Sequence, residues 1–317
     1  MTDTEPPTSS QANATDAGAT AQRIIDNVEQ VIVGHHDEIE HLLIAMLARG
    51  HVLLEDVPGV GKTMLSRAVA ASVDGSFKRV QFTPDLLPSD ITGVNVYNQQ
   101  SQAFEFREGP IFANVVLGDE INRAPPKTQS ALLEAMEEEQ VTVDGETRDL
   151  PTPFTVIATQ NTVEQDRTYD LPMAELDRFM TKLHLGYPNA DEEVAMLDRV
   201  VGDHPIDDLS PVATLEDLRE AREATAAITV EEPVQRYVTQ LANYTREHAQ
   251  LGASPRASLS LLRAAQGRAL LEGRDYVTPD DVQREAYVVF PHRITTGSTN
   301  QTPAQLLASA LDAIPVP

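Results

Sequence analysis

Short apolar runs and stretches of helical spacing alternate through the first 188 residues of this 317-residue chain. The runs predict strands at residues 52–54, 78–82, 115–120, 154–159 and 181–185. Between these runs, apolar residues recur three and four positions apart, as amphipathic helices require. Apolar strands separated by helices are typical of a parallel sheet that is covered on both faces. The sequence therefore predicts an α/β domain over residues 21–188.

Two segments inside this domain alternate apolar and polar residues around a polar turn, which predicts β-hairpins. The first covers about residues 93–106 and turns at Asn98-Gln99-Gln100-Ser101. The second covers residues 141–148, where Asp144-Gly145 suits a type I′ turn. We expect the first hairpin to project from the domain.

The two ends of the chain differ from the α/β part. Residues 1–20 are polar, rich in Ser, Thr and Pro, and without periodicity, which predicts a disordered tail. Residues 189–317 show no strand-like alternation of any length and predict a separate helical domain. Its expected helices are 191–201, 215–224, 234–248, 256–272, 279–287 and 304–311.

The clearest motif for function is Glu-Asp-Val-Pro-Gly-Val-Gly-Lys-Thr at residues 55–63, between a predicted strand and a predicted helix. This context wraps backbone N–H groups around phosphate oxygens and distinguishes the motif from a chance Gly-Lys-Thr. Lys62 would reach the outer phosphates, and the Thr63 hydroxyl would ligate Mg²⁺. Asp56 replaces the usual first glycine, and Asp tolerates unusual backbone angles better than most residues. The residues expected at the nucleotide are Asp56, Val57, Pro58, Gly59, Val60, Gly61, Lys62, Thr63 and Met64.

Polar residues follow two of the predicted strands. Asp119 and Glu120 end the strand 115–120, and functional side chains of a parallel sheet gather at such carboxyl ends, beside the phosphate loop. We expect Asp119 to hold Mg²⁺, directly or through water, and Glu120 to polarise the attacking water. Asn161 follows the strand 154–159, where it can hydrogen-bond the attacking water or the γ-phosphate, or simply cap a turn.

Composition narrows the function classes. The chain has no cysteine, which excludes disulfides, thiolate zinc sites and cysteine nucleophiles. The N-terminal residues contain no hydrophobic segment, and no apolar run approaches the ~18 residues that span a bilayer. We therefore expect a cytoplasmic protein.

Charge excludes further classes. The net charge is −25, and only four of the 24 basic residues are lysine. An acidic surface repels phosphate backbones and anionic lipid, so generic nucleic-acid or membrane binding is not expected. Acidic excess with scarce lysine resembles the composition of proteins from salt-loving archaea, and an acidic surface without environmental meaning is the alternative.

Five motifs together resemble the MoxR-type AAA+ ATPases, over about residues 32–287. They are LLEDVPGVGKT at 53–63, DEINRAPPKTQSALLEAMEE at 119–138, VTVDGETRDLPTPFTVIATQN at 141–161, LDRF at 176–179 and SPRA at 254–257. The resemblance implies a P-loop NTPase of αβα layers, followed by an all-α lid domain. It also implies a ring, usually hexameric, that binds ATP and Mg²⁺ between neighbouring subunits.

The same resemblance implies roles for residues outside the phosphate loop. Asn161 matches the first sensor, and Arg256 matches the second sensor, which lies on the lid and touches the γ-phosphate. Arg178 matches the arginine finger that enters the neighbouring site to neutralise developing charge, with a salt-bridged helix-end arginine as the alternative. Arg123 is a second candidate for acting between subunits. Gly34 would place a bend near the adenine ring, or form a plain turn between helices.

The function that the resemblance implies is chaperone-like remodelling, driven by ATP hydrolysis, in the assembly or maturation of partner complexes. The expected partner is a von Willebrand A domain protein. A nucleotide-controlled scaffold with slow turnover is the second interpretation, although an intact Glu120 favours hydrolysis. A ring helicase is disfavoured by the net charge and by an aromatic content of 5 %. The loop 166–172 departs from the usual Gly and Pro of the family, with Arg167 and Asp170 in their place.

Overall fold

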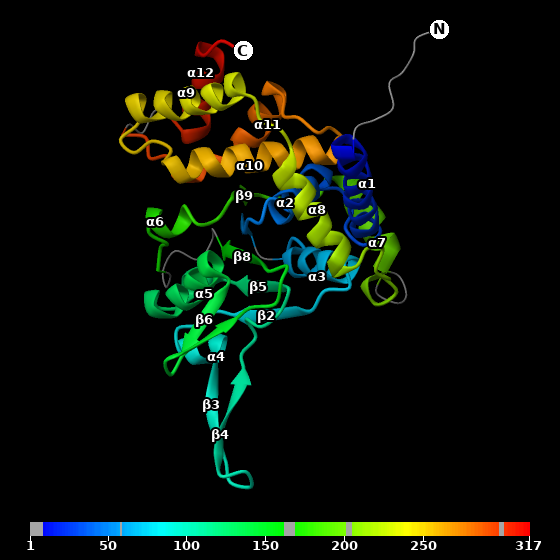
Figure 1. The fold of residues 1–317 in the computed structure, drawn as a ribbon, viewed down its shortest axis with the longest axis vertical. Helices are drawn as coiled ribbons and strands as arrows, with labels where there is room; N and C mark the ends of the chain where they lie inside the picture. The colour runs from blue at the N-terminus through cyan, green and yellow to red at the C-terminus, as the bar shows by residue number, and fades with distance from the viewer. Residues whose placement is uncertain (1–8, 58, 162–168, 201–204, 298–300) are drawn as a thin grey trace.

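The computed structural model describes residues 9–57, 59–161, 169–200, 205–297 and 301–317. At its centre lies a five-stranded parallel sheet with the strand order β2-β5-β8-β1-β9 (Figure 1). Each predicted strand is present, with its ends shifted by no more than two residues. The strands are β1 (Val52–Asp56), β2 (Phe77–Gln81), β5 (Val115–Asp119), β8 (Thr155–Asn161) and β9 (Thr181–Leu183).

Both faces of the sheet are buried, because alternate residues of a strand pack into two different apolar clusters. On β1, Val52 and Leu54 pack with α1, α2 and α3, whereas Leu53 packs with α5. Burial on both faces explains why the strands are apolar throughout, and the predicted αβα layers are confirmed. The helices of this part are α1 (Ser9–Glu29), α2 (His36–Leu47), α3 (Lys62–Ser72), α4 (Pro88–Thr92), α5 (Pro126–Glu138) and α6 (Met173–Leu176).

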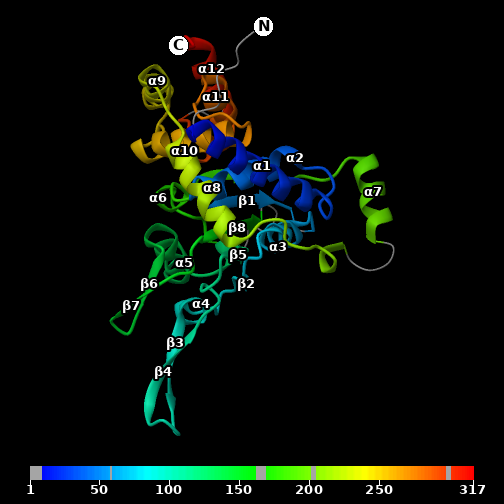
Figure 2. The ribbon, with the colours of Figure 1, turned by 45° about the vertical axis from the view of Figure 1, so that its right-hand side comes forward.

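Both predicted hairpins are present, and the first extends far from the sheet (Figures 1 and 2). It pairs β3 (Gly93–Asn98) with β4 (Ala103–Glu108), and the second pairs β6 (Gln140–Val143) with β7 (Glu146–Asp149). Asp144 and Gly145 have φ values of +52° and +86°, as a type I′ turn requires. The guanidinium of Arg148 lies 4.0 Å from the ring centroid of Phe106, so the bases of the two hairpins are in contact.

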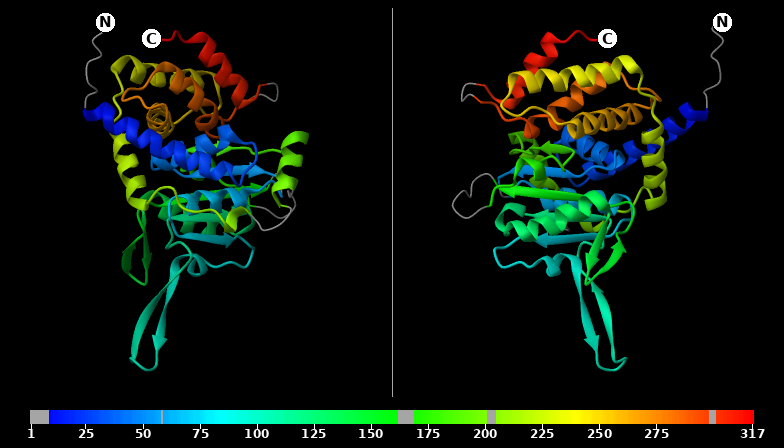
Figure 3. Two further views of the ribbon diagram at one scale, coloured as in Figure 1. Left: turned by 90° about the vertical axis from the view of Figure 1, so that its right-hand side faces the viewer. Right: turned by 60° about the vertical axis from the view of Figure 1, so that its left-hand side comes forward.

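The C-terminal part is helical, as predicted, and lies at the end of the molecule opposite the long hairpin (Figure 3). At Gly267 of α10, a Cβ would lie 3.0 Å from Cγ2 of Ile44, so the glycine lets α10 pack closely on α2. No helix in the described part of the chain is long and apolar enough to cross a membrane. The C-terminal helices are α7 (Ala190–Val200), α8 (Leu215–Ala227), α9 (Glu232–His248), α10 (Pro255–Leu271), α11 (Pro279–Val289) and α12 (Pro303–Ala313).

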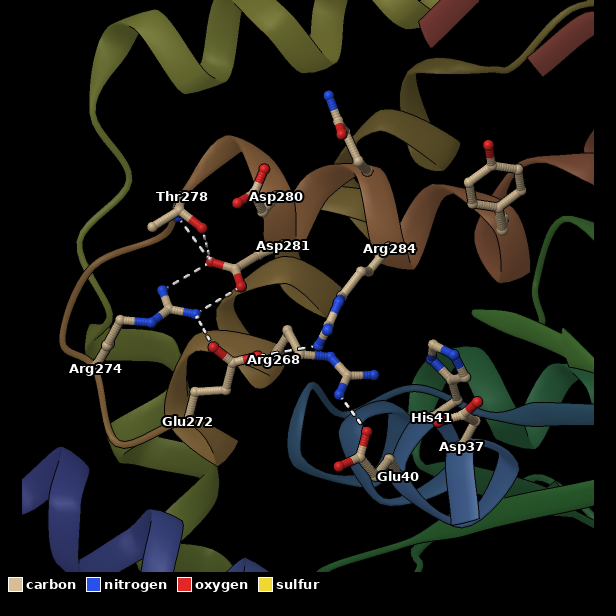
Figure 4. Close-up of a pocket in the computed structure, with 12 residues that line it drawn as sticks. Asp37, Glu40, His41, Arg268, Glu272, Arg274, Thr278, Asp280, Asp281 and Arg284 are labelled. Carbon is tan, nitrogen blue, oxygen red and sulfur yellow. Dashed lines mark hydrogen bonds and ion pairs between the residues drawn. The ribbon is translucent and has the colours of Figure 1, made fainter. Parts of the chain in front are cut away.

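Charged side chains also join α2 to α10 and α11. The guanidinium of Arg268, 3 % exposed, donates from Nε to Oε1 of Glu285 over 2.9 Å and from Nη1 to Glu40 of α2 (Figure 4). Nδ1 of His41 lies 3.0 Å from the other oxygen of Glu285. A buried charge without its partner is strongly destabilising, so this network fixes the helical part on α2.

The N-terminal tail differs from the expectation. The first eight residues lie outside the described part, but α1 begins at Ser9, so the prediction of disorder is wrong from this residue onward. Ala14 is 2 % exposed, and a Cβ at Gly18 would lie 2.4 Å from the carbonyl oxygen of Leu270. Small residues, which carry little hydrophobic signal, therefore bring this end of α1 against the C-terminal helices.

Candidate nucleotide site

The phosphate loop connects β1 to α3 at the carboxyl edge of the sheet. Gly59 and Gly61 have φ values of +90° and +91°, in the left-handed region that favours glycine, and a Cβ at either would meet no atom within 4 Å. Because α3 begins at Lys62, its unpaired N–H groups face the loop. Pro58 lies outside the described residues. The strand, turn and helix that the motif requires are present.

Asp56, in place of the usual first glycine, connects the loop to the chain that leads into α7. Its side chain is 7 % exposed, and Oδ1 accepts a 2.7 Å hydrogen bond from the N–H of Val57. Oδ2 accepts another, also of 2.7 Å, from the N–H of Gly186. Tyr187 and Pro188, which follow Gly186, line the same hollow as the loop. Since a glycine could accept neither bond, Asp56 couples the phosphate loop to that wall of the hollow.

Lys62 lies against the backbone of the loop. Its Nζ donates to the carbonyl oxygens of Asp56 and Val57, over 3.2 Å in each case. Burial lowers the pKa of Lys62, and the charges of Asp56, Asp119 and Glu120 act in the opposite direction. The ammonium group and the two carboxylates after β5 therefore share one electrostatic site.

Asp119 ends β5, and its carboxylate is held by both neighbouring strands. The residue is 9 % exposed, and Oδ1 accepts from the hydroxyl of Thr159 on β8 over 2.7 Å. Oδ2 accepts from Arg79 on β2, through Nε at 3.1 Å and Nη2 at 2.5 Å. The sequence reasoning missed Thr159 and Arg79. Thr159 could have been found from its place two residues before Asn161, near the end of a strand that flanks β5.

Glu120 follows β5 with a left-handed backbone, at a φ of +56°. One carboxylate oxygen, Oε2, accepts from Nε2 of Gln81 over 2.8 Å and from Nη1 of Arg123 over 2.7 Å. Its backbone N–H donates to the hydroxyl of Thr159 over 2.8 Å, which places this threonine between the two acidic residues. The carboxylate expected to act on water is thus held by two donors that the sequence reasoning did not assign to it.

Asn161 ends β8 beside the phosphate loop, in register with Asp56 of β1, and is 8 % exposed. The three residues Asn161, Asp56 and Asp119 therefore lie at the same edge of the sheet. This edge is where a doubly wound α/β sheet binds its ligands.

A mostly apolar hollow of about 400 Å³ adjoins the loop. Residues from the α1–α2 turn, the loop, the first turn of α3 and the start of α7 line it, including Met64 and Met196. Gly34 makes the turn with a φ of +71°, and a Cβ on it would lie 2.8 Å from the Glu192 carboxylate. An apolar hollow beside a phosphate loop fits the planar base of a nucleotide.

Arg178 and Arg256 lie together, but at the other edge of the sheet. Both form ion pairs with Glu137 near the end of α5, and Arg178 also donates from Nη1 to the carbonyl of Leu133 over 2.9 Å. They line a hollow with His51, which immediately precedes β1 and so marks the amino edge. The structure therefore brings the two arginines together and separates them from the phosphate loop across the length of the strands.

The loop 166–172 is described only from Tyr169, and residues 166–168 lie outside the described part. The N–H of Tyr169 donates to the carbonyl of Asn122 over 2.7 Å. Nε2 of Gln129 donates to the Tyr169 carbonyl over 3.3 Å. The end of this loop is thus attached to the segment that follows Glu120.

The donors at the phosphate loop fit Mg²⁺. No group of three or more His, Cys, Asp or Glu side chains that could hold a metal occurs among the described residues. Mg²⁺ does not need such a cage, because it keeps several waters and binds through one or two protein oxygens and substrate phosphates. Thr63, in the first turn of α3, and Asp119, at the end of β5, are the oxygen donors suited to it.

The phosphate loop, the acidic residues after β5 and the helical C-terminal part define an AAA+ nucleoside triphosphatase. Residues 51–181 match the model of the ATPase family associated with various cellular activities, and residues 241–311 match the AAA lid domain. By its relatives, the chain belongs to the MoxR family of AAA+ ATPases.

Three comparisons support this assignment. The chain is 43 % identical over 286 residues to Chaperone MoxR1 of Mycobacterium tuberculosis, covering 87 % of this chain and 75 % of that protein. It is 52 % identical over 274 residues to the uncharacterized protein YeaC of Bacillus subtilis, covering 86 % of each. A crystal structure from Cytophaga hutchinsonii, provisionally described as an ATPase, superposes with a TM-score of 0.91 at 38 % identity and 98 % coverage of both chains.

Proposed function

We propose that this protein is a Mg²⁺-dependent ATP hydrolase that works as a hexameric ring and remodels partner protein complexes. The observation that carries the proposal is the division of the site between the two edges of the sheet. Lys62, Asp119 and Glu120 belong to the carboxyl edge, whereas Arg178 and Arg256 belong to the amino edge. A head-to-tail contact between copies joins two such different surfaces, and repeated contacts close into a ring.

Within one copy, the phosphate loop and Lys62 bind the phosphates of ATP. Thr63 and Asp119 would hold Mg²⁺, which when bound neutralises charge on the β- and γ-phosphate oxygens. Glu120 accepts a proton from the attacking water, and Asn161 orients this water.

The neighbouring copy supplies the arginines. Arg178 acts as the finger that stabilises charge developing on the transferred phosphoryl group, and Arg256 acts beside it as the second sensor. Their shared partner Glu137 holds both side chains at the surface until a neighbour's phosphates replace it. Arg123, bound to Glu120 in its own copy, is the weaker candidate for the finger.

ATP hydrolysis per subunit, measured against protein concentration with Mg²⁺ in high potassium chloride, tests the proposal. The rate of the wild type should rise steeply as rings form. It should be lost in Lys62→Ala, which cannot bind ATP, and in Glu120→Gln, which binds but does not turn over. A flat rate that survives in Glu120→Gln would overturn the assignment.

Mixing variants separates a finger that acts between subunits from one that acts within its own copy. Arg178→Ala and Lys62→Ala should each be inactive, and together should recover part of the activity, because each supplies what the other's site lacks. Arg219→Ala, in an exposed ion pair on α8, is the matched control and should keep full activity. No recovery at any mixing ratio would contradict a finger acting between subunits.

A nucleotide-controlled scaffold is the second candidate function, favoured by the two donors that hold Glu120. A restrained base keeps basal turnover slow, so that ATP binding itself would control assembly and partner docking. The name of the M. tuberculosis relative supports a chaperone role, with a von Willebrand A domain protein as the proposed partner. We further propose a cytoplasmic location and adaptation to high salt.

A further inference from the structure

Helix α7 carries an apolar face that no other element covers. Val194 and Leu197 are each 58 % exposed, and the neighbouring Met196 is 42 % exposed. They lie three residues or fewer apart, so Val194 and Leu197 share one side of the helix. Large hydrophobic side chains gathered at this exposure on one element mark an interaction surface.

The same helix is acidic around this face. Asp191, Glu193 and Asp198 are exposed, and their carboxylates form no ion pair with any residue of the described chain. The partner of α7 must therefore combine an apolar contact with positive charge, since an acidic face disfavours another acidic face.

One surface of this protein has that chemistry. On α10, Leu259 is 47 % exposed and lies between Arg256 and Arg263, one turn from each. Arg49, before β1, lines the same hollow as these three residues. Neither Arg49 nor Arg263 forms an ion pair with a carboxylate among the described residues. The α10 surface, which we define as Arg49, Arg256, Leu259 and Arg263, is thus an apolar side chain surrounded by unneutralised positive charge.

We propose that α7 of one copy docks on the α10 surface of a second copy of this chain. Val194 and Leu197 contact Leu259, and the carboxylates beside them face Arg263 and Arg49. The charge complementarity selects this occupant, because each surface carries an exposed leucine and the charge that the other lacks.

The placement of the two surfaces makes the contact head-to-tail. Figures 1 and 2 show α7 and α6 on opposite sides of the molecule. The hydroxyl of Ser254 at the start of α10 donates to Asp177 directly after α6, so the arginine end of α10 lies on the α6 side. Two copies joined through α7 and α10 each keep one surface free, and further copies extend the chain until it closes.

The contact also joins the two parts of the nucleotide site, and in this respect it rests on the proposed function. Met196 and Glu192 of α7 line the hollow beside the phosphate loop. Arg178 and Arg256 line the hollow that contains Leu259. Docking α7 on α10 therefore carries the arginines of one copy toward the nucleotide of the next.

Sedimentation velocity of full-length variants with Mg²⁺ and a non-hydrolysable ATP analogue tests the contact. Leu197→Asp removes the apolar face of α7, and Leu259→Asp removes the α10 surface, so each variant alone should stay monomeric. An equimolar mixture should form dimers and no larger species, because one intact α7 meets one intact α10 surface. Leu251→Asp, at a leucine 48 % exposed outside both surfaces, is the matched control and should assemble like the wild type.

Three outcomes would overturn the proposal. They are a monomeric wild type under these conditions, unchanged assembly of Leu197→Asp and Leu259→Asp, or a mixture that stays monomeric although both variants melt at the wild-type temperature. Any of these would mean that α7 and α10 do not meet.

Activity of the mixture separates this contact from the proposed function. The one joined site uses the phosphate loop of the Leu259→Asp copy. Adding Lys62→Ala to that copy should abolish hydrolysis, whereas adding it to the Leu197→Asp copy should leave hydrolysis unchanged. Dimers without any hydrolysis would leave the contact in place and count against the ATPase.

Discussion

Gln81, the last residue of β2, donates from Nε2 to Oε2 of Glu120 over 2.8 Å. In the parallel sheet Gln81 is in register with Asp119, so the strand next to β5 places its terminal amide beside the proposed base. Arg123 donates to the same oxygen over 2.7 Å. A carboxylate with two donors is a weaker base, because the hydrogen bonds stabilise its charged form.

Gln81→Ala should therefore raise basal ATP turnover and leave the KM for ATP nearly unchanged. Loss of a hydrogen bond worth about 1 kcal/mol corresponds to about a fivefold increase in kcat. Gln140→Ala is the matched control, because Gln140 donates to Glu138 over the same 2.8 Å at an exposed site away from the loop. A kcat below that of the wild type would mean that Gln81 positions Glu120 for catalysis and does not restrain it.

Asp56→Asn should weaken ATP binding with little effect on kcat. The asparagine amide keeps one acceptor oxygen, but its NH₂ group then faces the N–H of either Val57 or Gly186. An unsatisfied donor pair costs about 1–3 kcal/mol, which corresponds to roughly a tenfold to hundredfold rise in Kd. Isothermal titration of Glu120→Gln with and without Asp56→Asn measures this shift, and unchanged affinity would show that the bond to Gly186 is irrelevant to the nucleotide.

His51 should make the fold sensitive to mild acid. Its Nδ1 accepts from the N–H of Val156 over 3.0 Å, so the proton is on Nε2, which donates to the carbonyl of Met136 over 2.8 Å. Burial lowers the pKa of His51 from 6.5 to about 4. The unfolded chain therefore takes up a proton first as the pH falls. Stability should decline between pH 6.5 and about 4, by about 3 kcal/mol in full for this residue.

The free energy of unfolding, measured from pH 7 to pH 4.5, tests this dependence. His51→Gln keeps a donor and an acceptor and removes the titration, so its curve should be flatter than that of the wild type. His248→Gln, at an exposed histidine of α9, should follow the wild type. Equal slopes for the wild type and His51→Gln would assign the acid sensitivity to other groups.

Lowering the salt concentration should destabilise the ring before the subunit unfolds. With a net charge of −25, copies repel one another strongly when the Debye length grows from ~3 Å at 1 M to ~10 Å at 0.1 M salt. Sedimentation after dialysis from about 2 M to about 0.1 M potassium chloride should show dissociation, which sucrose at equal osmolality should not prevent. Full assembly and activity at the lower salt concentration would sink the proposed salt adaptation.

Much of the fold was predictable because its signals are local. The apolar runs, the Asp144-Gly145 turn and the cap of α10, where Ser254 accepts from the N–H of Ala257, each act within a few residues of sequence. The start of α1 was not predictable in this way. Its buried face uses Ala14 and Gly18, whose value lies in close approach to other helices and not in their own hydrophobicity.

By itself, the sequence determined the phosphate loop, the acidic pair after β5 and the family, because these depend on residue types at fixed local spacing. Only the tertiary structure decided which strands flank Asp119, and so which donors hold Glu120. It also decided that Arg178 and Arg256 share Glu137 at the edge opposite the phosphate loop. Strand order and long-range packing create these neighbours, and no local pattern in the chain encodes a contact between segments so far apart.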